Sequence, residues 1–193
     1  MKQDLNRLSV EALGKLFPIV IIDYDPAWKK LFYSEKQIIQ GAIGVNNIIR
    51  IEHIGSTAIP GLCAKPTIDI LVEIKDDTDT GKMIELLKQI GYDPIPKPEN
   101  PAPHLMFAKG YSETGYSGQT FHIHLRYRGK QDEVLFRDYL IRNPTAANEY
   151  AELKRKLSIV FINNREAYTN NKTDFIKEIL LKCREEAKNK SYF

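Results

Sequence analysis

The pattern of apolar and polar positions predicts mixed strands and helices, followed by a final third that is helical. Apolar residues at intervals of three or four indicate helices, and short β-branched runs indicate strands. We expect helices at residues 9–16, 26 to a glycine at 41 or 44, 80–90, 133–141, 145–161 and 168–188. We expect strands at residues 19–22, 48–54, 67–74, 105–108 and 119–127. Five prolines between residues 93 and 103 predict a loop without regular structure.

This order of elements predicts an α/β (α+β) fold, in which helices flank a mixed β-sheet and the C-terminal portion is helical. We expect one domain over residues 1–193. Within it, an α/β core would occupy residues 17–128 and a helical subdomain residues 129–193.

Composition narrows the classes of protein. The chain is 42% hydrophobic and 27% charged, with a net charge of +3, which is ordinary for a globular protein. Basic and acidic residues are interleaved, so a nucleic-acid partner is not expected. The apolar run at residues 17–22 is too short to span a bilayer, and residues 1–4 lack the apolar core of a signal peptide. Cys63 and Cys183 are far apart and predict free thiols in a cytoplasmic protein.

The segment from residue 51 to 74 carries the most specific chemistry. A β-branched run ends at Gly55 and Ser56, and a Pro/Gly loop with Lys65 leads to an apolar strand that contains Asp69. Glycine lets the backbone approach a phosphate closely, and serine can donate a hydrogen bond to it. A carboxylate among apolar residues requires a charged partner or a metal ion. We interpret Gly55 and Ser56 as phosphate ligands and Asp69 as a catalytic metal ligand. Lys65 either neutralises the phosphate or pairs with Asp69.

A second candidate group lies on the strand at residues 119–127. Alternation places His122, His124 and Arg126 on one face of that strand. Two imidazoles at this spacing suit a transition metal, and the alternative is a sheet face packed under a helix. We interpret both histidines as metal ligands, His124 also as a catalytic acid or base, and Arg126 as a phosphate ligand. His53 and His104 are further histidines that can join this group.

The helical third offers tyrosines and lysines that can contact a base and its phosphates. Lys154 follows Tyr150 by four residues, and Lys172 follows Tyr168 by four, so each pair shares a helix face. The commoner explanation is an amphipathic surface, in which Arg137 pairs with the aspartate that follows it. We assign only Lys172 to phosphate binding.

Taken in order, these motifs resemble the GrpB family, a branch of the nucleotidyltransferase superfamily. The resemblance runs from about residue 24 to residue 180 and rests on HIGSTAIPGL at 53–62, AKP at 64–66 and IDI at 68–70. Residues 24–28, the two histidines, FRDYL at 136–140 and the pair at 168 and 172 also fit. It implies a small mixed sheet flanked by helices. Some relatives are fused to dephospho-coenzyme A kinase, which implies nucleotide-linked metabolism.

The superfamily pattern also implies a pair of carboxylates at i and i+2 after the Gly-Ser turn, with a third on a later strand. Asp69 matches the first carboxylate, but Leu71 occupies the second position and no acid lies at residues 119–127. Glu73 is on the same face but about 6–7 Å further along the strand. Magnesium needs several oxygen ligands, whereas the histidines suit zinc or manganese, so the cofactor expected is a divalent ion: Mg, Mn or Zn.

The leading interpretation is a protein that binds a nucleotide or another phosphorylated small molecule, with metal-dependent nucleotidyl or phosphoryl transfer. One alternative is a degenerate, non-catalytic ligand-binding or interaction module, which Leu71 favours. The other is a metal-dependent hydrolase that uses His53, His122, His124 and Asp69. A single site requires Asp69 and His124 to face the same cleft.

Overall fold

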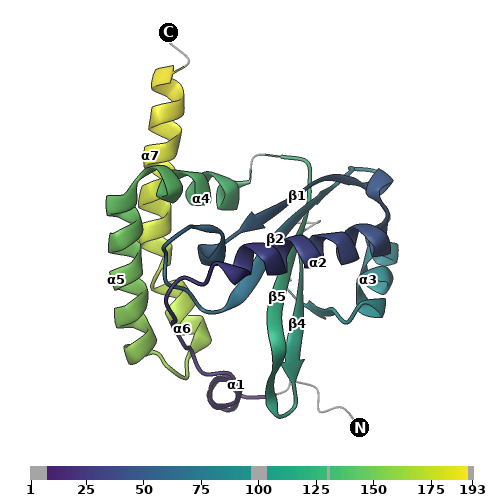
Figure 1. Cartoon of the computed structure of the whole chain (residues 1–193), viewed down its shortest axis with the longest axis horizontal. Helices are drawn as coiled ribbons and strands as arrows, with labels where there is room; N and C mark the ends of the chain where they lie inside the picture. Colours follow the sequence, from purple (N-terminus) through teal and green to yellow (C-terminus); the bar gives the residue numbers. More distant parts are fainter. Residues whose placement is uncertain (1–7, 97–103, 130, 191–193) are drawn as a thin grey trace.

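The computed structural model describes residues 8–96, 104–129 and 131–190 and has the mixed α/β architecture that the sequence predicts (Figure 1). The strands are β1 (Ile48–Ile54), β2 (Thr67–Ile74), β3 (Asp93–Ile95), β4 (Leu105–Ser112) and β5 (Gly115–Tyr127). The α-helices are α1 (Val10–Leu16), α2 (Ala27–Ile43), α3 (Thr80–Gln89), α4 (Asp132–Arg142), α5 (Pro144–Val160), α6 (Arg165–Asn170) and α7 (Thr173–Lys190). None of these helices has the length and apolar character needed to cross a bilayer.

The five strands form one mixed sheet in the order β1-β2-β5-β4-β3. Strand β2 pairs antiparallel with β1 and parallel with the central strand β5. In the parallel register, Asp69 lies beside His122 and Leu71 beside His124. Because paired residues in neighbouring strands point to the same face, the register brings the two candidate motifs together.

The main hydrophobic core lies between one face of the sheet and helices α2 and α3. Ile68, Ile70, Val72 and Ile74 of β2 are fully buried there, and Trp28 of α2 packs against the same core. The period of two along β2 therefore turns the odd-numbered positions, including that of the strand aspartate, to the opposite face. This division of faces is the one that the sequence predicts.

A second core joins the loop after β1 to the C-terminal helices, which stand beside the sheet in Figure 1. Leu62 and Cys63 of the loop are buried against Tyr150 of α5 and Cys183 of α7. Both cysteines are free and buried, in agreement with the sequence prediction of unpaired thiols. This core fixes the C-terminal helices against the Gly-Ser end of the sheet.

Four local predictions are wrong. Residues 19–22 form no strand within the described chain; Ile22 only makes an isolated bridge to Ala64. The reason is that the backbone amide of Ile19 donates a hydrogen bond to the carbonyl of Ile162, next to the C-terminal helices. Residues 93–95 form β3 instead of a loop, since an edge strand tolerates Pro94; residues 97–103 lie outside the described residues. Strands β4 and β5 extend into a hairpin that turns at residues 112–115, and the expected helix at 168–188 divides into α6 and α7 at residues 171–172.

Candidate functional site

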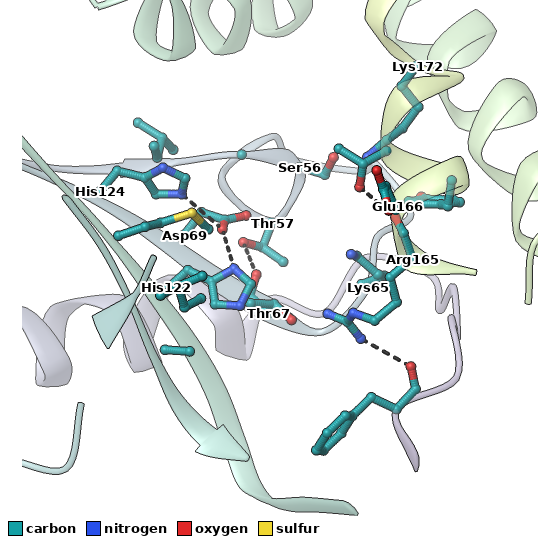
Figure 2. A pocket seen from close by; sticks show the side chains of 18 of the residues that line it. Ser56, Thr57, Lys65, Thr67, Asp69, His122, His124, Arg165, Glu166 and Lys172 are labelled. Carbon is teal, nitrogen blue, oxygen red and sulfur yellow. Dashed lines mark hydrogen bonds and ion pairs between the residues drawn. The ribbon is translucent and has the colours of Figure 1, made fainter. Parts of the chain in front are cut away.

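A cavity of about 1640 Å³ separates the open face of the sheet from the C-terminal helices. Residues from both halves of the chain line it, and most of the predicted site residues are among them: Gly55, Ser56, Lys65, Asp69, His122, His124 and Lys172. Figure 2 shows the histidines and Asp69 at one side of the pocket, and Lys65, Arg165 and Lys172 at the other. The structure therefore brings the turn, the histidines and a C-terminal lysine to one cavity.

The Gly55-Ser56 turn is packed directly against Asp69. Gly55 has φ +70°, a conformation that favours glycine, and a Cβ placed there would lie 2.4 Å from Asp69 Oδ2. The next residue, Thr57, is buried and donates its hydroxyl to the carbonyl of Thr67, at a distance of 3.1 Å. The turn is thus held at both ends, with its backbone close to the carboxylate.

Asp69 is the centre of a hydrogen-bonded cluster with both histidines. Its Oδ1 lies 3.2 Å from His122 Nδ1 and 3.4 Å from His124 Nε2. Arg126 Nη2, which can only donate, lies 3.5 Å from His124 Nδ1, so His124 Nε2 carries the proton that it donates to Asp69. With Nδ1 of His122 donating to Asp69, its Nε2 accepts from Tyr111 Oη, 2.9 Å away.

Burial alone would raise the pKa of Asp69. The hydrogen bonds and charges of His122 and His124 outweigh burial and hold this pKa well below its usual range. Burial lowers the pKa of His122 despite the neighbouring carboxylate. Asp69 and His124 lie on the same face of the sheet and line the same cavity. They can therefore belong to a single site, as the sequence interpretation requires.

The carboxylates do not fit the magnesium centre that the superfamily pattern implies. Leu71, at the second acidic position, is fully buried. Glu73 is buried too, and it accepts hydrogen bonds from Arg50, from Gly129 N at 3.1 Å and from Gln131 at 2.7 Å. In the described part of the chain, no three His, Cys, Asp or Glu side chains are arranged to hold a metal ion. Coordination of Mn or Zn by Asp69 and the two histidines stays a prediction.

Arg126 lies outside the lining of the cavity. Its Nη1 donates to the carbonyls of Leu105 and Leu125 at 3.1 and 3.0 Å, and its Nη2 lies 3.6 Å from Glu133. The side chain therefore joins β4, β5 and α4 and orients His124, and these contacts occupy most of its donors. This placement gives no support to the predicted phosphate contact.

Two further histidines do not join the cluster. His53 stacks on Phe32 of α2, with ring centroids 4.9 Å apart, and its Nε2 lies 3.0 Å from Thr57 Oγ1. It thus points to the helix-covered face of the sheet, away from Asp69, and the four-residue hydrolase site is not formed. His104 has a buried Nδ1 without a partner in the described structure, and burial lowers its pKa.

The opposite wall of the cavity is cationic. Lys65, Lys154, Arg165 and Lys172 all line it. Burial, reinforced by the charges of neighbouring cations, lowers the pKa of Lys65 to about 7, that of Lys154 to about 7 and that of Lys172 to about 8. These positive charges are crowded in the free protein, which is the condition that an anionic ligand relieves.

Comparisons with known proteins show the family to which the chain belongs. The family model described as "GrpB protein" matches residues 18–182. The chain belongs to the GrpB family. It is 38% identical over 164 residues to UPF0157 protein PA4798 of Pseudomonas aeruginosa, covering 84% of this chain and 66% of that protein. It is also 34% identical over 180 residues to UPF0157 protein BH1888 of Halalkalibacterium halodurans, covering 91% of this chain and 89% of that protein. The chain thus spans just under two thirds of the length of the P. aeruginosa protein.

Solved structures agree with the family fold. The crystal structure of the conserved protein GrpB from Enterococcus faecalis matches 87% of this chain and 99% of that chain, with a TM-score of 0.74 and 28% identity. A weaker likeness, with a TM-score of 0.47 and 11% identity, is to the Cid1 poly(U) polymerase bound to MgGTP, over 69% of this chain and 42% of that chain. The fold that the sequence resemblance implies is confirmed.

Part of the cationic wall of this GrpB-family cavity escaped sequence reasoning. Arg165 was not singled out, and Lys154 was noted only for its spacing from Tyr150. Helical periodicity tells which residues share a face, but not that the face of α5 with Lys154 meets the loop before β2. A signal for Lys154 was available, since a lysine four residues from an aromatic ring repeats at Lys172.

Proposed function

We propose that this GrpB-family chain binds a nucleotide or another phosphorylated small molecule in the cavity between the sheet and the C-terminal helices. Gly55 and Ser56 contact its phosphate groups, and Lys65 and Lys172 neutralise them. One observation carries the proposal: the Gly-Ser turn opens into the same cavity as the cationic wall. A glycine-containing backbone turn opposite several cations is a suitable environment for a phosphate.

The size and the lining of the cavity support a ligand as large as a nucleotide. Its volume, about 1640 Å³, exceeds the roughly 300–1000 Å³ typical of small-molecule pockets. Tyr150 and Tyr168 also line it, and both are buried aromatic rings next to lysines. The lysines beside these rings would hold the charged end of the ligand.

Transfer of a nucleotidyl or phosphoryl group is the further activity that the fold suggests. Asp69 and His124 are adjacent at the cavity wall, where they can orient an acceptor hydroxyl and hold its proton. The alternative is binding without catalysis, and the buried Leu71 favours it because it replaces an expected carboxylate. We also propose a cytoplasmic location, which the two unpaired cysteines support.

Isothermal titration of ATP, GTP, CTP and UTP, each with and without Mg²⁺ or Mn²⁺, tests the binding proposal. We expect at least one nucleotide to bind, and Lys65→Gln to weaken its affinity about tenfold, the loss of one good charged contact. Lys75→Gln is the matched control, because Lys75 is exposed at the far end of β2 and should leave the affinity unchanged. If no nucleotide binds under any condition, the nucleotide proposal is wrong.

Measuring the release of pyrophosphate or phosphate from a bound nucleotide distinguishes group transfer from binding without catalysis. Turnover that Asp69→Asn abolishes, while nucleotide affinity stays measurable, supports transfer. Stoichiometric binding without turnover across candidate acceptors supports the non-catalytic alternative.

A further inference from the structure

Four cations surround the inner part of the cavity, and they come from four separate segments. Lys65 precedes β2, Lys154 lies on α5, Arg165 begins α6 and Lys172 lies between α6 and α7. Side chains from such distant parts of the sequence meet only because the second core docks the helices onto the sheet. The cluster is therefore a product of the fold.

The partners of these cations, among the described residues, are neutral groups. Lys154 Nζ donates to the carbonyl of Cys63, and Arg165 Nη1 to the carbonyl of Phe17, at a distance of 3.2 Å. The ammonium groups of Lys65 and Lys172 lie 5.2 and 4.3 Å from the centre of the Tyr168 ring. Glu113 aside, no carboxylate of the described residues forms an ion pair with any of the four. Lys154 is 2% exposed and donates to Cys63, so the charges left for a ligand that enters the cavity are those of Lys65, Arg165 and Lys172.

The carboxylate of Asp69 lies across the cavity from these cations and is engaged by other donors (Figure 2). Asp69 already accepts hydrogen bonds from both histidines through Oδ1. The acids that a magnesium-dependent site would require are missing or engaged elsewhere, since Leu71 is buried and Glu73 accepts three other donors. The four cations thus lie opposite an incomplete set of acids, although the described residues that line the whole cavity also include six carboxylates: Asp69, Asp93, Glu113, Asp132, Glu133 and Glu166.

We propose that the cavity binds the di- or triphosphate chain of its ligand without a divalent metal ion, with Lys65, Arg165 and Lys172 in the role of the metal. This inference rests on the proposed function and specifies the chemistry of its phosphate subsite. Because Lys65 and Lys172 lie near one aromatic ring, a single phosphate chain can contact both. Arg165 offers a planar set of donors that suits phosphate oxygens.

The competition between magnesium and the lysines provides the test. Sodium tripolyphosphate and ATP are titrated into the full chain in EDTA and again in Mg²⁺. We expect both probes to bind in EDTA, and Mg²⁺ to weaken binding several-fold, because it neutralises the phosphates that the lysines would contact. Binding that occurs only after Mg²⁺ or Mn²⁺ is added overturns the inference while the proposed function stands.

The two probes separate the inference from the proposed function. Tripolyphosphate binding in EDTA without binding of any nucleotide supports the phosphate subsite and contradicts a nucleotide ligand. Absence of binding by either probe under both conditions overturns the inference and the nucleotide proposal together.

Lys172 is the residue of choice for a variant, because its side chain contacts the Tyr168 ring and holds no backbone carbonyl in place. Lys172→Ala is expected to lose at least tenfold in tripolyphosphate affinity in EDTA, and Lys172→Arg to keep most of it. Lys177→Ala, on the exposed surface of α7, is the control. Thermal unfolding of each variant shows that the fold is retained. Equal affinity of the Ala variant and the native protein would contradict the assignment.

Discussion

Gly55 is the position at which a single residue constrains the site most tightly. Its φ of +70° disfavours any side chain, and the space for a Cβ is taken by Asp69. A side chain at this position would therefore strain the backbone and push against Asp69. Because the groups are closely packed, a shift of Asp69 would also disturb its hydrogen bonds to the two histidines.

Gly55→Ala is therefore expected to destabilise the protein by about 2–4 kcal/mol, from the left-handed backbone and the overlap with Asp69. Gly61→Ala is the matched control: Gly61 also has a positive φ, +78°, but no atom lies within 4 Å of its Cβ position. The control should lose only about 1–2 kcal/mol, the backbone contribution alone. Urea unfolding measures both, and equal losses would show that the contact with Asp69 carries no cost.

The lowered pKa values of the lysines predict a pH dependence of binding. In the free protein, burial and neighbouring cations lower the pKa of Lys65 and Lys154 to about 7 and that of Lys172 to about 8. A bound phosphate chain favours the charged lysines and raises these pKa values. Since folded pKa values lie below the ordinary lysine value, protons are missing from the free protein above neutral pH and are taken up on binding.

Titration calorimetry at about pH 8, in buffers of different ionisation enthalpy, is expected to show proton uptake when tripolyphosphate binds. The affinity should fall as the pH rises from about 7 to 9, because the lysines lose their protons across this window. An affinity that is constant or rises across this window would mean that the lysines do not hold the phosphates.

At the scale of elements, Glu73 lies on the same face of β2 as Asp69 but stabilises the fold by connecting neighbouring elements. Its side chain is 3% exposed and ties β2 to Arg50 of β1 and to the connection between β5 and α4. That connection leads into the helices that complete the cavity, so Glu73 positions them from a distance.

Glu73→Gln is expected to cost about 1–3 kcal/mol in unfolding free energy, because the donors around it lose a charged acceptor. The affinity for tripolyphosphate should change less than about twofold, since Glu73 is absent from the cavity lining. Glu85→Gln on the surface of α3 is the control, with a loss below about 0.5 kcal/mol. A stable Glu73→Gln protein that has lost ligand or metal binding would identify Glu73 as a ligand instead.

Prediction of the elements succeeded where the pattern was strong and local. The bounds of β1 and β2 are those expected, because each is rich in β-branched residues and lies between clear turn residues. The run at residues 19–22 is just as apolar but forms no strand, since its backbone meets the C-terminal helices instead of a sheet edge. Apolar character alone does not tell which surface buries a segment.

At the scale of the whole molecule, the cavity belongs to neither half of the chain alone. The turn, Asp69 and the histidines come from the α/β part, and three of the four cations come from the helices. A ligand that contacts both walls should therefore couple them.

Hydrogen exchange is expected to show that bound tripolyphosphate protects amides in both parts, around residues 55–67 and around residues 150–172. At a ligand concentration of 100 times Kd, the gain in unfolding free energy should be about 2.7 kcal/mol. Protection confined to one part would place the phosphate chain on a single wall and contradict the shared site.

The sequence by itself determined the family, the strands β1 and β2, the glycine turn and the face on which Asp69, His122 and His124 lie. These follow from local residue order, because strand alternation and turn chemistry act over a few residues. Only the tertiary structure decided which cations face that turn. It also decided that the side chains of Glu73 and Arg126 are held by hydrogen bonds and ion pairs to neighbouring elements. Contacts between distant segments depend on how the two cores dock, and no periodicity along one segment encodes that docking.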